Sequence, residues 1–350
     1  MVPGAQPAEP GRPPIPRRNV IGGLVIGLPA SALFLYLATR GLDPGEVANV
    51  VRQTSLGWVV LAAASMGIVY AAQALRWRRI AHAAGMDLPW HSFLRMVICG
   101  VAVNNVVPGR PGEILRGYWL AQESGAPAAR AFSTVIVDRV SDVFVLVAGL
   151  LISYPFVPHP SWLRDLVMAA LAVSVAIAFV LFACRFWVRH RARGGRTVPD
   201  WVRSHWLGQQ LSRLVRGAAA TVNGRVALVI TGLSVLAWSG FVLSAWLIAR
   251  ALGIEVTPVE LVFVTAVVNL GVAIPSSPGF IGTYQWLCVS ALGLFGVGRP
   301  EAFAFSVLLQ AVWFIPTTLA GFVLLAMRAS RWRSSRRVAT PGTGTQAVRP

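Results

Sequence analysis

The chain has 350 residues, of which 55% are hydrophobic and only 13% are charged. A soluble domain carries about 25% charged residues, and one this apolar would expose large apolar patches to water. The net charge of +18 comes from arginine alone, since the sequence has no lysine. The arginines lie between apolar runs rather than on one compact basic domain, which favours anionic lipid over nucleic acid as their partner.

The N-terminal segment 1–19 is rich in Pro and Gly and is predicted to be disordered. The apolar run 20–39 follows it. Crossing the hydrocarbon core takes about 20 residues, so this run predicts a retained membrane anchor. A secretory signal peptide is the alternative, although its apolar region is shorter, about 7–15 residues.

Other apolar runs of spanning length follow along the chain, at 57–75, 132–154, 166–186, 226–249 and 302–327. Arginine placement orients them. With the N-terminus inside, most arginines flank the cytoplasmic ends, including the run Arg76-Trp77-Arg78-Arg79 after the second span. The arginines left outside are Arg40, Arg52, Arg164, Arg250 and Arg299. We therefore expect a multi-pass protein of the plasma membrane with both termini in the cytoplasm.

Two further apolar segments, 93–120 and 261–297, are broken by Pro, Gly and polar residues. The topology requires the first to enter and leave on the cytoplasmic side and the second on the outer side. The predicted fold class is therefore an all-α integral membrane protein with six full transmembrane helices and two re-entrant or broken-helix hairpins in an inverted repeat, 6–8 spans in all.

The predicted membrane domain covers residues 20–327 and contains one long polar loop, 185–225. Apolar residues at helical spacing in this loop predict an amphipathic helix on the inner leaflet, with a solvated linker as the alternative. Residues 328–350 begin with arginines and continue with Gly, Thr and Pro, so they are predicted to form a disordered basic tail.

The two broken segments share an order of residues: Asn, apolar residues, Pro, Pro-Gly, and then a polar side chain and Trp. The matching positions are Asn104 or Asn105 with Asn269, Pro108 with Pro275, Pro111 with Pro278, Gly112 with Gly279, and Glu113 with Gln285. Interrupted helices at matching places in two halves of a membrane protein point to a transport site.

The physical reason is that Pro blocks a helix and Gly permits a turn. The freed backbone groups cannot face lipid, so they must face protein or a wet cavity. A helix that restarts after the break points its N-terminal amides into that cavity, which favours an anion such as phosphate.

Charged residues accompany the first break: Arg110, Glu113 and Arg116, the last two on one helix face. Charges at membrane depth are costly and usually functional, and the guanidinium fork suits a lipid phosphate. A cytoplasmic loop with ordinary solvated charges is the alternative. No His or Cys cluster has metal-ligand spacing and no nucleotide-binding Lys loop occurs, so we expect neither metal nor cofactor.

The third long span opens with Asp138, Arg139 and Asp142, one turn of helix. One interpretation is a local ion-pair cluster that anchors the helix at the interface. The other pairs Arg139 or Asp138 with Glu113 and Arg110 across the cavity.

Three motifs carry a family resemblance: NNVVPGRPGEILR (104–116), STVIVDRVSDV (133–143) and PSSPGFIGTYQ (275–285). With these motifs the chain resembles the lysylphosphatidylglycerol synthase transmembrane-region family, flippase-like membrane proteins, over residues of about 20–327. The resemblance implies that a lipid head group moves between leaflets. Synthase members carry an additional cytoplasmic domain, which we expect this chain to lack. Members usually have an acidic residue where this chain has Gln285.

The sequence thus predicts a flippase-like, non-enzymatic protein that moves a phosphate-containing lipid, either an aminoacyl-phospholipid or a polyprenyl-phosphate glycolipid. We expect Arg110 and Arg116 to hold the phosphate while the tails stay in the bilayer. The predicted binding residues are Asn104, Asn105, Pro108, Arg110, Gly112, Glu113, Arg116, Asp138, Arg139, Asn269, Pro275, Pro278, Gly279 and Gln285. The alternative is a membrane enzyme, or an accessory subunit of a separate synthase or glycosyltransferase.

Overall fold

The computed structural model describes residues 29, 31–158, 160–193, 224–272 and 278–338. All regular structure in this part of the chain is helical, as predicted. Residues 31–39 of the first predicted span form a helix. Three predictions concern residues outside this part of the chain: the disorder of 1–19, the amphipathic stretch within 194–223, and the last residues of the tail.

Long helices contain the other predicted spans and extend beyond them. They are α3 (Leu56–Ala83), α6 (Ala128–Ser153), α7 (Ser161–Arg193), α10 (Gly224–Ala251) and α13 (Arg299–Val338). All except α6 contain a stretch long and apolar enough to cross a membrane. Helix α6 differs because Asp138, Arg139 and Asp142 lie within its apolar run. The prediction of an all-α membrane protein is confirmed.

Two helices continue past the boundaries that the sequence predicts. Helix α3 continues through the arginine run at 76–79 to Ala83 and buries Arg76 completely. The tail does not begin at residue 328, because α13 continues to Val338. Its last turns contain Arg, Ala and Ser but neither Gly nor Pro, so nothing in the sequence interrupts the helix before Pro341.

Shorter elements form two hairpins at the predicted places. The first consists of α4 (Trp90–Val106) and α5 (Pro111–Ser124). The second consists of α11 (Pro258–Gly271), the single turn η2 (Pro278–Phe280) and α12 (Thr283–Gly293). Each of these helices is shorter than the about 20 residues that a full span needs. Pro111 and Pro258 stand at helix starts, where the missing N–H costs nothing.

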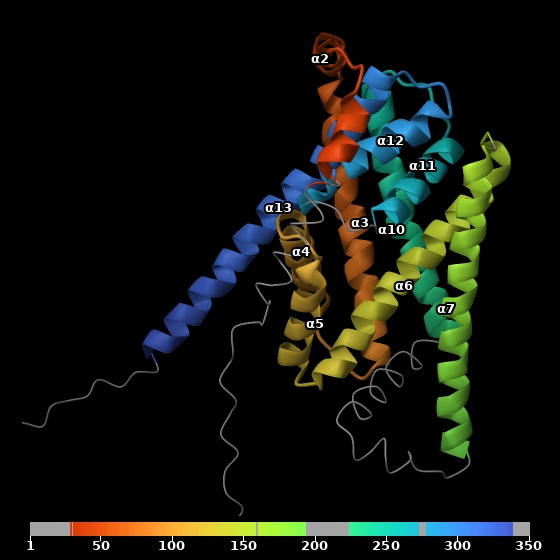
Figure 1. Cartoon of the computed structure of the whole chain (residues 1–350). Helices are drawn as coiled ribbons and strands as arrows, with labels where there is room; N and C mark the ends of the chain where they lie inside the picture. Colours follow the sequence, from red (N-terminus) through yellow and green to blue (C-terminus); the bar gives the residue numbers. More distant parts are fainter. Residues whose placement is uncertain (1–28, 30, 159, 194–223, 273–277, 339–350) are drawn as a thin grey trace, which may run out of the picture.

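The packing divides the chain into two equivalent units, α3–α6 and α10–α13. Helix α3 packs along α10, and the Ser55 N–H at the start of α3 donates to the Ala251 carbonyl at the end of α10, so the two run antiparallel. Helix α4 packs on α13 as α11 packs on α6. The two hairpins lie at opposite ends of the bundle (Figure 1). These relations confirm the predicted inverted repeat.

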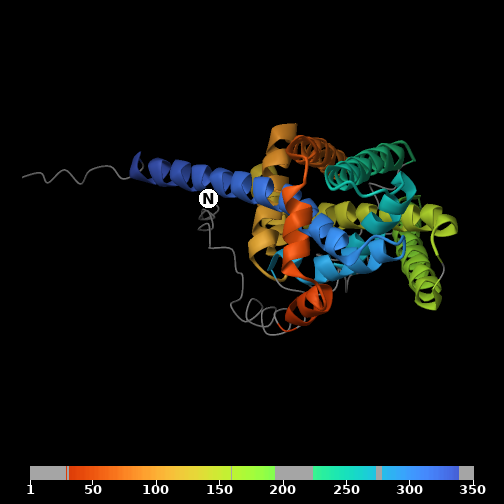
Figure 2. The ribbon, with the colours of Figure 1, turned by 90° about the horizontal axis from the view of Figure 1, so that it is seen from above.

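Two helices lie at the margins of this bundle. Helix α7 stands at one edge and packs mainly on α6, which precedes it. The C-terminal half of α13 projects from the other edge (Figure 2).

Two short elements complete the described structure. Helix α2 (Pro44–Arg52) has no buried residue and lies at the end that holds α11 and α12 (Figure 1). A single turn, η1 (Tyr154–Phe156), joins α6 to the segment before α7.

Candidate functional site

The two broken segments meet in the middle of the bundle through Arg110. This residue precedes α5 and has left-handed backbone angles, φ 54° and ψ 45°, which are uncommon outside glycine. Its Nη2 donates to the carbonyl of Val272, at the end of α11, over 3.0 Å. Its guanidinium also lies 5.4 Å from the centroid of the Phe280 ring in η2. One side chain from the first repeat therefore touches both halves of the break in the second.

A cavity of about 300 Å³ lies beside this contact. We call it the polar cavity. Helices from both repeats supply its walls, and its polar lining residues include Tyr70, Gln73, Asn104, Asn105, Arg110, Glu113, Arg116, Arg139, Asp142 and Asn269. Seven of these are predicted binding residues; Tyr70, Gln73 and Asp142 are additions. Such a concentration of polar groups is uncommon in a bundle that is otherwise apolar, and makes the cavity the candidate functional site.

Behind the cavity lies an ion-pair network centred on Asp138, whose side chain is completely buried. Arg76 Nε donates to one carboxylate oxygen over 2.9 Å. Arg116 Nη2 and Arg139 Nη2 both donate to the other over 2.8 Å. Three helices, α3, α5 and α6, are thus tied to one carboxylate, which satisfies the requirement that a buried charge be paired.

Two further carboxylates extend the network toward the cavity. Asp142 accepts from Arg76 Nη1 over 2.6 Å and from the indole Nε1 of Trp238 over 3.1 Å. Glu113 lies 3.2 Å from Arg116 Nη1 and 3.7 Å from Arg139 Nε. Of the two interpretations of this cluster, the structure therefore shows the pairing of Arg139 with Glu113 across the cavity. The local ion pairs of the other interpretation are also present, because Arg139 pairs with Asp138 and, over 3.3 Å, with Asp142.

The network is balanced in charge but not in hydrogen bonds. It holds three arginines, at 76, 116 and 139, and three carboxylates, at 113, 138 and 142. Among the described residues, Arg76 Nη2, Arg116 Nε and Arg139 Nε have no hydrogen-bond partner. A buried donor without a partner is costly. Arg110, which forms no ion pair within the described part of the chain, adds a positive charge to this wall of the cavity.

Of the three arginines that line the cavity, two are more accessible from it than Arg116 is. The Arg139 side chain is 37% exposed, whereas that of Arg116 is 3% exposed and stacks 4.2 Å from the ring centroid of Trp77. Arg110 belongs to the exposed residues. The geometry therefore offers Arg110 and Arg139 to a ligand, and leaves Arg116 as a support for Asp138.

The amides at the start of α5 do not face the cavity unpartnered, contrary to expectation. The Gly112 N–H donates to Asn104 Oδ1 over 2.7 Å, and the Glu113 N–H donates to the Arg110 carbonyl over 3.2 Å. The Asn side chain of α4 thus occupies the place predicted for an anion. Gly112 is needed here, because a Cβ on it would lie 1.9 Å from the Gly100 carbonyl oxygen.

The second broken segment supplies no charge. Asn269 lines the cavity and its Nδ2 donates to the Thr265 carbonyl within its own helix. Gln285 lies outside the cavity lining: its Oε1 accepts from the Gly282 N–H and its Nε2 donates to Gln310. Gln310 Nε2 donates in turn to the Gly279 carbonyl.

The remaining predicted residues shape the breaks. Asn105, which also lines the cavity, donates from Nδ2 to Thr318 Oγ1 of α13. Gly279 has a positive φ of 68° and packs against the Asn105 carbonyl, so η2 rests on α4. Pro108 is buried in the turn between α4 and α5, and Pro278 begins η2. Pro275 lies outside the described residues.

Sequence reasoning missed Arg76 and Trp238, which complete the network. Arg76 belongs to a run of arginines that resembles a membrane-edge cluster. The missed signal is in α6: Asp138 and Asp142 lie one turn apart in an apolar helix and need a cation from elsewhere. Trp77, next to Arg76, is fully buried and donates to Thr134 Oγ1 over 3.0 Å.

Comparison with known proteins agrees with this architecture. The profile of the lysylphosphatidylglycerol synthase TM region family matches residues 20–321. A UPF0104 membrane protein of Methanothermobacter thermautotrophicus is 25% identical over 311 residues, 83% of this chain and 90% of that protein. The UPF0104 membrane protein MJ1595 of Methanocaldococcus jannaschii is 22% identical over 310 residues, 84% and 92% of the two chains.

A relative of another kind is the glycosyltransferase AglD of Haloferax volcanii, which is 27% identical over 306 residues. The match covers 78% of this chain but only 49% of AglD. Similarity to that protein is therefore confined to about half of its length. Since the family profile spans both repeats and all elements of the site, the chain belongs to the lysylphosphatidylglycerol synthase TM region family.

Proposed function

We propose that the protein moves a phosphate-containing lipid between leaflets of the plasma membrane without changing it chemically. The cargo is an aminoacyl-phospholipid or a polyprenyl-phosphate glycolipid. The observation that carries the proposal is the polar cavity between the two repeats, where Arg110 and Arg139 stand accessible in an apolar bundle. A lipid phosphate is the anion that a membrane supplies in quantity, and guanidinium groups bind it through paired hydrogen bonds.

The position of the cavity supports transport rather than simple binding. Its walls come from both units of an inverted repeat, the arrangement in which rocking of one unit against the other exposes a central site to each side in turn. Arg110 already links the units through Val272. Neutral groups of a head group would meet Asn104, Asn105 and Asn269, which line the same cavity.

Reconstitution tests the proposal directly. Vesicles that contain the purified protein and a fluorescent phosphatidylglycerol should show movement of the label between leaflets, with the lipid mass unchanged. Arg110→Ala should abolish movement and retain the folded protein, because it removes an accessible cation without opening the Asp138 network. Arg52→Ala, on the exposed helix α2, is the matched control and should move lipid normally. Normal movement by Arg110→Ala would refute the site.

A second candidate function is that of an accessory subunit for a lipid-modifying enzyme. The similarity to half of a glycosyltransferase favours it. Such a subunit would move no lipid alone, and would co-purify with an enzyme that changes the mass of the lipid. Mass spectrometry of the lipid before and after incubation therefore separates the two functions.

For the orientation in the membrane we propose cytoplasmic termini, with the α4–α5 hairpin on the cytoplasmic side. The support is the excess of arginine at that end. The test introduces single cysteines into a cysteine-free background, one at Gly125, beside this hairpin, and one at Gly296, beside the other. The two cysteines should react with a membrane-impermeant reagent from opposite sides of the membrane. Reaction of both from the same side would refute the orientation.

A further inference from the structure

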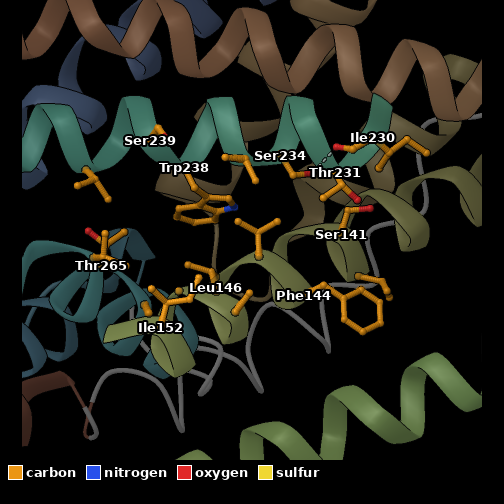
Figure 3. A pocket seen from close by; sticks show the side chains of 18 of the residues that line it. Ser141, Phe144, Leu146, Ile152, Ile230, Thr231, Ser234, Trp238, Ser239 and Thr265 are labelled. Atoms are coloured by element: carbon orange, nitrogen blue, oxygen red, sulfur yellow. Dashed lines mark hydrogen bonds between the residues drawn. The ribbon is translucent and has the colours of Figure 1, made fainter. Parts of the chain in front are cut away.

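A second cavity, of about 520 Å³, lies between α6 and α10. We call it the apolar cavity. Figure 3 shows Phe144, Leu146 and Ile152 of α6 facing Ile230, Thr231 and Trp238 of α10. Its size is within the range of small-molecule pockets, roughly 300–1,000 Å³. Its lining is almost entirely aliphatic and aromatic, with hydroxyls of Ser141, Thr231, Ser234, Ser239 and Thr265.

Two of these hydroxyls already have partners within their own helices. Ser141 Oγ donates to the Val137 carbonyl and Ser234 Oγ to the Ile230 carbonyl, each one turn back along the chain. Ser234 Oγ also accepts from Arg76 Nη1 over 3.0 Å. These side chains therefore present their apolar parts to the cavity, which suits a hydrocarbon ligand.

Trp238 stands between the apolar and polar cavities and lines both, as Leu146 does. Its indole N–H donates to Asp142, on the side of the ion-pair network, while its ring projects from α10 toward α6 in the apolar cavity (Figure 3). A side chain with one polar edge and one apolar face marks the boundary between a wet and a dry environment. The two cavities are thus adjacent, with Trp238 and Leu146 in their common wall, and opposite in chemistry.

The apolar cavity also has a route to the bilayer. Thr231 and Ala148 in its lining are exposed. Helix α7 contributes Leu181 to the lining and packs mainly on α6. A chain from the surrounding lipid can therefore enter at the exposed edge marked by Thr231 and Ala148.

We propose that the apolar cavity holds one hydrocarbon chain of the same lipid whose phosphate occupies the polar cavity, with Trp238 at the junction of head and tail. This inference rests on the proposed function and deepens it, because it makes the chain part of what is recognised. It also replaces the expectation that the tails stay in the bilayer. A water-soluble phosphate ester would then bind weakly and would not be a substrate.

The test uses phosphatidylglycerol with a photoreactive diazirine in the middle of one acyl chain, in phosphatidylcholine vesicles that contain the whole protein. Crosslinks in the wild type should fall on α6 and α10, near Phe144 and Thr231. Thr231→Phe, which fills the cavity, should lower both these crosslinks and lipid movement by at least five-fold. Ser141→Phe on the facing wall is a second filling variant, and Ala178→Phe on the exposed face of α7 is the control.

A separate measurement distinguishes failure of this inference from failure of the proposed function. Binding of glycerol phosphate in detergent should be unchanged in Thr231→Phe and lost in Arg110→Ala. Two outcomes would overturn the tail site and leave the function intact. In the first, the wild type moves lipid but its crosslinks fall elsewhere. In the second, neither filling variant changes lipid movement. Crosslinks that persist unchanged in Arg110→Ala would also overturn it, since they would report surrounding lipid. Absence of both movement and phosphate binding in the wild type would overturn the proposed function itself.

Discussion

The two broken hairpins occupy equivalent places in the repeats, yet only the first has charged residues at its break. In the first, α5 is joined to the long helix that follows it by the Arg116–Asp138 ion pair. In the second, α12 is joined to α13 by a hydrogen bond between Gln285 and Gln310. The same mechanical link is made once with charges and once with neutral amides. Charge is therefore not needed to build a broken hairpin, and its presence in the first is what supports the anion site that we propose there.

The charged link should be the more sensitive of the two. Asp138→Asn removes the carboxylate shared by Arg76, Arg116 and Arg139, so that two carboxylates remain for three positive charges in a buried network. Breaking a buried ion pair in this way costs about 3–5 kcal/mol. We expect the free energy of unfolding, measured in detergent with a chemical denaturant, to fall by this amount.

Asp165→Asn is the control for this measurement, because Asp165 lies exposed near the start of α7. It should leave the free energy of unfolding unchanged. Equal stability of the two variants would mean that the Asp138 network does not hold α3, α5 and α6 together.

The neutral link should be less sensitive. Gln285→Ala removes the acceptor of the Gly282 N–H and the donor to Gln310 Oε1, while Gln310 Nε2 keeps its bond to the Gly279 carbonyl. Each neutral hydrogen bond contributes about 0.5–1.5 kcal/mol net, so the loss of two costs about 1–3 kcal/mol. Unfolding in the same denaturant should therefore show a smaller loss than Asp138→Asn gives. A loss as large as that of Asp138→Asn would contradict the distinction between the two hairpins.

The smallest of these effects concerns the start of α5. Asn104→Ala removes the acceptor for the Gly112 N–H, and loss of such a cap costs about 1 kcal/mol. The freed amide would then face the polar cavity and become available to an anion. Glycerol phosphate should accordingly bind to this variant at least as tightly as to the wild type, as isothermal titration calorimetry would measure. Weaker binding would show that Asn104 itself contacts the ligand.

The sequence predicts the architecture well where the local pattern decides it. Pro and Gly at 108–112 and 275–279 place both breaks, and arginine counts place the hairpins at opposite ends. The sequence does not predict contacts between residues that lie far apart along the chain. Arg76 finds its carboxylates 62 and 66 residues away, and nothing local separates a buried arginine from its solvated neighbours. The sequence does not predict the hydrogen bond of the Gly112 amide for a similar reason. Asn104 can accept this bond only because the chain turns between α4 and α5.

The left-handed backbone of Arg110 has a mechanical consequence. For a residue with a Cβ this conformation is less favourable by about 1–2 kcal/mol. The preceding Gly109 also has a positive φ, 84°, but as a glycine it avoids that penalty. Arg110 places a long cation at the strained position, where Val272 and Phe280 anchor it. The contacts of its guanidinium thus offset the strain in the loop. A bound phosphate that draws this group away from Val272 would also let the loop relax, so that loading the cavity loosens a side chain that ties the two interrupted helices together.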